Sequence, residues 1–300
     1  MTGKNKRIFI YSLSCVTFTI ALIAAFIYFS VDDRVKIETA VPAFSNNQIV
    51  ERLDSIALRP DSISEFITSL MEKAGITGLG VSIINRNAVV YQQYFGMADN
   101  RRREPLKPGM IWYGASLSKL IFADIVLQLV EEHVLALDTP LFRYLPKPVF
   151  AYKTSRIQQL FGANYIDYTG LEDDERFKKI TARMCLSHTA GFPNWRWIES
   201  DGRLKIKFEP GSRYSYSGEG MFLLQFVIEQ ITGRNFEDIA FEKVFKPLGM
   251  TRSSYVWQRE YDANYARGHD KNGNDLGIPK SNVPYAAGSL STTLEDVSRY

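Results

Sequence analysis

The chain has 300 residues, of which 45% are hydrophobic and 23% are charged, so it can bury a sizeable core and is not a disordered polypeptide. Its 36 basic and 33 acidic residues give a formal net charge of +3 and form no basic stripe, which argues against a nucleic-acid-binding protein. With two cysteines and three scattered histidines, the sequence contains no disulfide framework, no metal-ligand spacing and no cofactor-binding motif.

The first predicted element is a membrane-spanning helix. Residues 8–31 contain no charged side chain, and a helix of that length rises about 36 Å, enough to cross a hydrocarbon core of about 30 Å. Basic residues precede this run, and Asp32 and Asp33 follow it, so the positive-inside rule places residues 1–7 in the cytoplasm. We expect a single-pass signal anchor in the cell (inner) membrane, with a periplasmic or extracellular catalytic domain.

A cleaved signal peptide is the alternative interpretation of this segment. The apolar region of a signal peptide is usually about 7–15 residues long and ends in an Ala-x-Ala-like site. The run here is longer and no such site follows Phe29, which favours an uncleaved anchor. Residues 32–60 carry mixed charges and two prolines without a sustained period, so they are predicted to link the anchor to a folded domain at residues 61–300.

The folded domain is predicted to begin with a helix and a hairpin. Residues 62–74 have the apolar spacing of an amphipathic helix, which Gly75 closes. Residues 79–84 and 88–95 are rich in β-forming side chains and are separated by Asn85-Arg86-Asn87, which indicates an antiparallel hairpin.

The remainder of the domain is predicted to be richer in helices. The charged residues 101–105 are predicted to form a solvated turn, and residues 117–134 and 222–231 apolar helices. Residues 146–180 carry prolines, aromatic residues and an acidic run, which favours a surface insertion. Strands followed by a helix-rich stretch indicate an α+β fold, with an antiparallel β-sheet flanked by helices, an inserted mostly helical subdomain, and the active site between them.

A serine and a lysine at the start of the helix at residues 117–134 have the spacing of an activated nucleophile. Ser116 and Lys119 are three positions apart, so their side chains share one face of a helix. A lysine held beside a serine can accept or relay the hydroxyl proton, which matters because a free hydroxyl is a poor nucleophile at neutral pH. The same spacing also arises by chance, and the alternative is a helix N-cap beside an exposed lysine.

Motifs around this pair and further along the chain occur in the order found in one enzyme family. They resemble those of the class C β-lactamase-related serine hydrolases and penicillin-binding proteins over roughly residues 75–300. The segments that carry the resemblance are residues 109–119, Leu137-Asp138-Thr139-Pro140, Leu186-Ser187-His188-Thr189-Ala190-Gly191-Phe192-Pro193, Pro210-Gly211-Ser212-Arg213-Tyr214-Ser215-Tyr216-Ser217-Gly218, Lys246-Pro247-Leu248-Gly249-Met250 and Ala287-Gly288-Ser289-Leu290-Ser291-Thr292-Thr293. The resemblance implies a β-lactamase/transpeptidase-like fold and a cofactor-free acyl-enzyme on Ser116. The implied substrates are esters, D-amino-acid peptides or β-lactams, either small molecules or cell-wall peptides.

The resemblance also implies a third catalytic residue and reveals one departure. Tyr216 matches the family's catalytic tyrosine, which exchanges protons between Ser116, Lys119 and the leaving group. In the family an asparagine usually follows two residues later and holds the substrate's amide carbonyl, but here the position is Gly218. Recognition of amide or lactam substrates is therefore an open question. The same departure supports an alternative, namely a catalytically impaired, membrane-tethered binding or sensor module that retains the fold.

Further expectations concern two single residues and the end of the chain. Glu219 is predicted to lie on the surface, and His188 to be structural. The resemblance implies a Lys-Thr-Gly or His-x-Gly motif on a later strand, which supplies a second oxyanion donor besides the Ser116 amide. No such motif occurs between Gly288 and Tyr300. We therefore expect a C-terminally incomplete domain that is poorly folded or inactive in this form.

Overall fold

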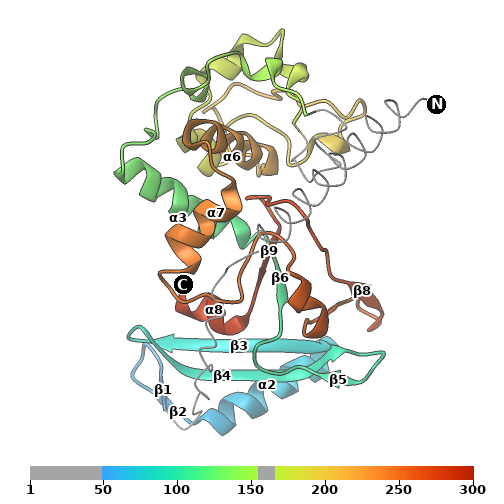
Figure 1. The fold of residues 1–300 in the computed structure, drawn as a ribbon. Coiled ribbons are helices and arrows are strands. Elements are labelled where there is room, and N and C mark those ends of the chain that lie inside the picture. The colour runs from blue at the N-terminus through green and yellow to red at the C-terminus, as the bar shows by residue number, and fades with distance from the viewer. Residues whose placement is uncertain (1–48, 155–165) are drawn as a thin grey trace, which may run out of the picture. The chain divides into compact units, whose positions relative to one another are not determined.

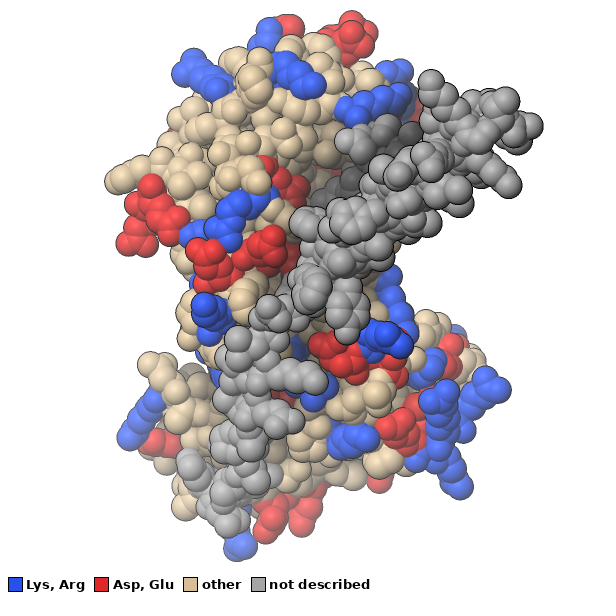
Figure 2. Space-filling view, in the orientation of Figure 1, with Lys and Arg blue, Asp and Glu red and all other residues tan. Residues whose placement is uncertain are grey.

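The computed structural model describes residues 49–154 and 166–300 (Figure 1). The predicted tail at 1–7, the predicted anchor at 8–31 and most of the predicted linker at 32–60 lie outside the described residues. Within the two described ranges, no helix is both long enough and apolar enough to cross a membrane. On the face drawn in Figure 2, acidic and basic side chains are intermixed over the described surface.

The predicted hairpin forms the longest ladder of the described structure. Strand β3 (Gly78–Asn85) pairs with β4 (Ala88–Asp99) through a turn in which Arg86 and Asn87 both have positive φ, 50° and 61°. This is the type I′ geometry that matches the twist of paired strands. β4 extends beyond the predicted end and pairs with β5 (Glu104–Pro105), so part of the predicted solvated turn is a short strand. The sheet order is β3-β4-β5.

The other strands form separate two-stranded ladders. They are β1 (Val50–Glu51) with β2 (Ala57–Leu58), β6 (Trp112–Ala115) with β9 (Leu290–Thr292), and β7 (Gly268–His269) with β8 (Asp275–Gly277), all antiparallel. The β6–β9 ladder joins segments that are far apart in the chain, because Tyr113 lies opposite Ser291. It therefore brings the residues before Ser116 next to those that follow Gly288.

The predicted helix near the start of the domain is α2 (Pro60–Ala74), which packs against the hairpin. It begins at Pro60, which is tolerated in the first turn because the N–H that it lacks would have no partner inside the helix. Gly75 ends the helix in the left-handed conformation, with φ of 65°. The buried Ile63 belongs to one apolar cluster with Tyr91 of β4, and Figure 1 shows α2 beside this sheet.

The remaining helices of the described chain are joined by turns and irregular segments. They are α3 (Ser118–Glu131), α5 (Ala182–Leu186), α6 (Gly218–Thr232), α7 (Phe236–Ala240), a π-helical turn at Phe241–Phe245 and α8 (Leu294–Arg299). Short 3-10 turns occur at Leu141–Tyr144, Val149–Ala151, Thr169–Leu171, Glu175–Lys179, Arg196–Ile198 and Arg259–Ala263. α6 ends at Gly233 as predicted, whereas α3 ends before Val134, because His133 adopts a positive φ of 59°.

The described part of the segment at residues 146–180, which excludes residues 155–165, is not a surface insertion. It contributes buried side chains to the main core, in which they join the apolar residues of α6. These side chains are Val149, Tyr168, Leu171, Phe177 and Ile180. The prediction was wrong because these apolar residues are spaced without a helical or strand period, and they reach the core from short 3-10 turns and the irregular segments between them.

Candidate active site

Ser116 lies in the tight turn between β6 and α3. Ala115, the last residue of β6, has φ of 43°, a left-handed conformation that is strained for a residue with a side chain and is frequent at functional sites. The Ser118 hydroxyl bonds to the Ala115 carbonyl and accepts a hydrogen bond of 3.0 Å from Leu290 N, which ties the turn to β9. The turn leaves the Ser116 side chain exposed and buries Ser118 and Lys119.

Lys119 points its ammonium group at Ser116 from the first turn of α3. Its Nζ lies 3.2 Å from Ser116 Oγ and also donates to the carbonyl oxygen of Ala287. The residue is only 7% exposed. Two aromatic rings face the ammonium, that of Tyr216 with its centroid 4.9 Å from Nζ and that of Trp195 at 5.8 Å. The lysine is therefore held in place with little access to water.

Tyr216 reaches the same serine from the segment that precedes α6. Its hydroxyl donates to Ser116 Oγ over 2.8 Å. Burial opposes ionisation of the phenol, but hydrogen bonds with Lys119 and Ser116 and the positive charge of Lys119 outweigh it and hold the pKa of Tyr216 below its usual value of 10. The structure thus brings together all three predicted site residues, Ser116, Lys119 and Tyr216.

His188 supports the tyrosine and makes no hydrogen bond with Ser116 in the described structure. Its ring packs on that of Tyr216 with centroids 4.5 Å apart, and its Nδ1 accepts a hydrogen bond of 3.0 Å from Ser217 N. Burial and the charge of Lys119 lower the pKa of His188 below 6.5. These contacts agree with the structural role predicted for this residue.

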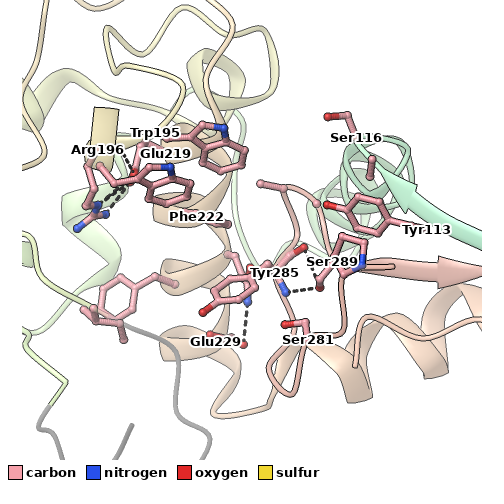
Figure 3. A pocket seen from close by; sticks show the side chains of 18 of the residues that line it. Tyr113, Ser116, Trp195, Arg196, Glu219, Phe222, Glu229, Ser281, Tyr285 and Ser289 are labelled. Carbon is pink, nitrogen blue, oxygen red and sulfur yellow. Dashed lines mark hydrogen bonds and ion pairs between the residues drawn. The ribbon is translucent and has the colours of Figure 1, made fainter. Parts of the chain in front are cut away.

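A cavity of about 530 Å³ opens beside Ser116 (Figure 3). Its volume is in the range of small-molecule sites. Aromatic side chains form much of its lining, namely Tyr113, Tyr168, Trp195, Trp197, Phe222, Phe226 and Tyr285. Among the described residues, no group of three or more His, Cys, Asp and Glu side chains could hold a metal ion.

Glu219 is buried, which corrects the prediction that it lies on the surface. It has no exposed area and pairs with Arg196, whose Nη2 lies 2.6 Å from Glu219 Oε2. The carboxylate also accepts a hydrogen bond of 2.8 Å from Arg196 N. The prediction failed because the first turn of α6 points into the domain, toward a loop that is remote in the chain.

Gly218 leaves room for a tryptophan. A Cβ atom at this position would lie 2.3 Å from Cζ3 of Trp195, far closer than atoms can approach. The indole of Trp195 therefore occupies the space into which a side chain at position 218 would extend. Sequence reasoning missed Trp195 and Arg196, although the Asn194-Trp195-Arg196-Trp197 run, with two of the four tryptophans in the chain, is an unusual local signal.

Comparison with known proteins reveals similar chains. A family model described as Beta-lactamase matches residues 63–300. The D-alanyl-D-alanine-carboxypeptidase/endopeptidase AmpH of Escherichia coli is 22% identical over 196 residues, which are 65% of this chain and 50% of that protein. Lovastatin esterase of Penicillium rubens is 26% identical over 210 residues, 63% of this chain and 50% of that protein.

Solved structures share the fold. A class C beta-lactamase superposes with a TM-score of 0.63 at 20% sequence identity, over 80% of this chain and 62% of that one. The chain spans about half the length of the curated relatives that it matches.

Proposed function

Since the match covers residues 63–300, the chain belongs to the beta-lactamase family, and from this premise we propose that it is a serine hydrolase acting through an acyl-enzyme on Ser116. The family and the β-lactamase-like α+β fold confirm what the motifs predicted. The observation that carries the proposal is that Lys119 Nζ and Tyr216 Oη both lie within hydrogen-bonding distance of Ser116 Oγ, at 3.2 and 2.8 Å.

Acylation follows from this arrangement. Ser116 Oγ attacks the substrate carbonyl carbon, and its proton passes to Tyr216 in the phenolate form, which the neighbouring ammonium of Lys119 stabilises. The backbone N–H of Ser116 is the proposed donor to the oxyanion. Tyr216 then gives the proton to the leaving group as its bond to the carbonyl carbon breaks.

Deacylation repeats these steps with water. A water molecule takes the place of the leaving group, and Tyr216 accepts one of its protons as the oxygen attacks the acyl carbon. When the bond to Ser116 Oγ breaks, Tyr216 returns the proton to that oxygen, and the carboxylic acid leaves. Each group ends in the state in which it began, so the cycle needs no cofactor.

Esters, D-amino-acid peptides and β-lactams can all react by this route. Among the relatives, AmpH is named as a peptidase and the Penicillium rubens protein as an esterase. We favour esters for this chain, because Gly218 provides no side-chain amide to hold a substrate's amide carbonyl. A binding or sensor module that has lost turnover is the second candidate, and Gly218 is its support.

We further propose that residues 8–31 anchor the domain in the membrane, with the catalytic part outside. The support is the uncharged run with basic residues before it and acidic residues after it. Protease added to intact spheroplasts should remove the bulk of the chain. Cleavage only after lysis would contradict this orientation.

Covalent labelling tests the proposed function. A fluorophosphonate probe should label the full-length protein on Ser116, as identified by mass spectrometry of the labelled peptide, and Ser116→Ala should lose both the label and ester hydrolysis. The matched control is Ser187→Ala, which removes another exposed hydroxyl, bonded to Thr189, and should retain both. Labelling of Ser116 without any turnover would favour the sensor module, and labelling that persists in Ser116→Ala would refute the assignment.

A further inference from the structure

One wall of the cavity is built from aromatic side chains that pack on one another. Trp195 stacks on Trp197 with ring centroids 4.8 Å apart and an interplanar angle of 11°. Trp195 also packs against Phe222, with centroids 5.5 Å apart and tilted ring planes, and Phe222 packs in the same way against Tyr285 at 5.4 Å. All four residues line the cavity, and together they are called the aromatic wall below. Figure 3 shows Trp195, Phe222 and Tyr285 on the α6 side and Ser116 and Tyr113 across from them.

The aromatic wall begins next to the nucleophile. The Trp195 ring lies 5.8 Å from Lys119 Nζ, which itself bonds to Ser116 Oγ. A group attached to the acylated carbonyl can therefore contact the wall without a long spacer. Flat apolar groups gain most from such a surface, because aromatic rings stack favourably and exclude water.

Two adjacent residues of α6 hold Trp195 in this position. Gly218 leaves the space that the indole fills. Glu219 fixes the next residue of the loop, because its carboxylate accepts hydrogen bonds from both the backbone N–H and the guanidinium of Arg196. Asn194, on the other side of Trp195, accepts hydrogen bonds from Gly218 N through its side chain and its carbonyl. The loop and the helix start thus fit each other on both sides of the tryptophan.

The position of Tyr216 decides which part of the substrate faces the wall. In the proposed mechanism Tyr216 protonates the leaving group, so the leaving group lies beside its hydroxyl. Tyr216 is not among the residues that line the cavity, whereas Ser116 is. The acyl group is therefore the part that extends into the cavity.

Resting on the proposed acyl-enzyme function, we infer that the chain selects esters whose acyl group carries an aromatic ring, and that Trp195 is the residue that determines this specificity. Three observations support this specificity: the packed rings of the aromatic wall, the nearness of Trp195 to Lys119, and the fit between Gly218 and Trp195. The alcohol part of the ester, which is the leaving group, lies beside the Tyr216 hydroxyl, on the solvent-exposed side of Ser116.

The test compares two esters that share one leaving group. For 4-nitrophenyl phenylacetate and 4-nitrophenyl acetate, the ratio of kcat/KM values reports recognition of the acyl group, because the departing phenol is the same. The full-length protein should prefer the phenylacetyl ester, and Trp195→Ala should lower the ratio about tenfold, the upper range for one aromatic contact. Trp195→Phe, which keeps a ring, should retain most of the preference.

A second variant tests the fit at position 218. Gly218→Ala should lower the same ratio, because its methyl group displaces the indole, but it should add little in a Trp195→Ala background. A merely structural role of Gly218 would instead give equal losses in both backgrounds. Phe66→Ala, which removes a ring 64% exposed on α2, is the control and should leave the ratio unchanged.

The outcomes separate this inference from the proposed function. If neither ester is hydrolysed and Ser116 takes no phosphonate label, the proposed function fails, and the inference fails with it. If both esters are hydrolysed by Ser116 but the ratio changes less than about twofold in Trp195→Ala, below the contribution of one aromatic contact, the inference alone is overturned. If circular dichroism shows that Trp195→Ala folds poorly, the labelling rates of Ser116 with an aryl and an alkyl phosphonofluoridate are compared instead in Trp195→Phe and Gly218→Ala. Gly218→Ala should lower the preference for the aryl reagent, and Trp195→Phe should retain most of it. An unchanged preference in Gly218→Ala would overturn the inference.

Discussion

Tyr216 Oη and Lys119 Nζ converge on one atom, Oγ of Ser116, and the ammonium lies 4.9 Å from the centre of the tyrosine ring. Two groups so placed share one proton-transfer step, and residues that act as a unit give non-additive losses. Lys119→Ala, Tyr216→Phe and the double variant should therefore lower the acylation rate by similar factors. Single-turnover kinetics with a chromogenic ester measures these rates. If the fold-loss in acylation rate of the double variant equals the product of the two single fold-losses, the residues act independently.

The same contact predicts how Tyr216 titrates. The pKa of Tyr216 lies below 10 because hydrogen bonds and the Lys119 charge outweigh burial, so replacing Lys119 by Met should raise it. The phenolate would then form only at higher pH. Absorbance at the tyrosinate band, taken as the difference from a Tyr216→Phe control, follows this single group among the 16 tyrosines. An unchanged titration in Lys119→Met would contradict a role for the lysine in lowering this pKa.

The buried ion pair under the Trp195 loop should matter for stability. Glu219 has no exposed area, and removing one partner of a buried pair leaves an uncompensated charge, which typically costs about 3 kcal/mol or more. Glu219→Gln should lower the free energy of unfolding in urea by that order. Glu51→Gln is the matched control, since its pair with Arg86 is exposed, and should cost less than about 1 kcal/mol. Equal effects of the two substitutions would mean that the buried pair contributes no more than a surface pair.

His188 should make stability depend on pH. Burial and Lys119 lower its pKa in the folded state, so between the folded value and 6.5 the unfolded chain binds more protons than the folded one. Its stabilising contribution is therefore complete above pH 6.5 and is lost as the pH falls through the folded pKa. The free energy of unfolding in urea, measured from pH 7.5 to 5, should decrease as the pH falls. His188→Asn should make this decrease smaller, because asparagine can accept a hydrogen bond from Ser217 N without titrating. An identical decrease in the variant would assign the pH dependence to other groups.

Local signals in the sequence were sufficient for several elements of the fold but not for the site. The Pro60 to Gly75 helix, the hairpin turn at Arg86 and the Gly233 helix end depend on the conformational preferences of a few adjacent residues, and all were predicted to within a few positions. Ser116 and Lys119 have the spacing of one helical turn, but this spacing also arises by chance, and the surrounding motifs of the family were needed to select the pair. Tyr216 could be identified only by resemblance, because it lies 100 positions from Ser116.

Features that depend on distant contacts were missed or misread. Glu219 looked like a surface residue because its partner, Arg196, lies 23 positions away on an irregular loop. The helix at residues 117–134 was predicted to be apolar, and the structure shows that Leu120 and Leu127 are 56% and 50% exposed, whereas Phe122 is fully buried. Trp195 belongs to no motif of the resembling family, and its role follows from its contacts with Trp197 and Phe222, its nearness to Lys119 and the space beside Gly218.

Hydrogen bonds join the turn at Ser116 to residues near β9, and they affect the order in which the chain folds. Lys119 and Ser118 contact Ala287 and Leu290, which are 168 and 172 positions further along the chain. During synthesis the turn around Ser116 cannot reach its final geometry until these late residues have emerged, and contacts of such long sequence separation form slowly. The nucleophile therefore stays unassembled until the chain has been synthesised beyond Leu290, and reactivity should be acquired in one step at that point rather than gradually.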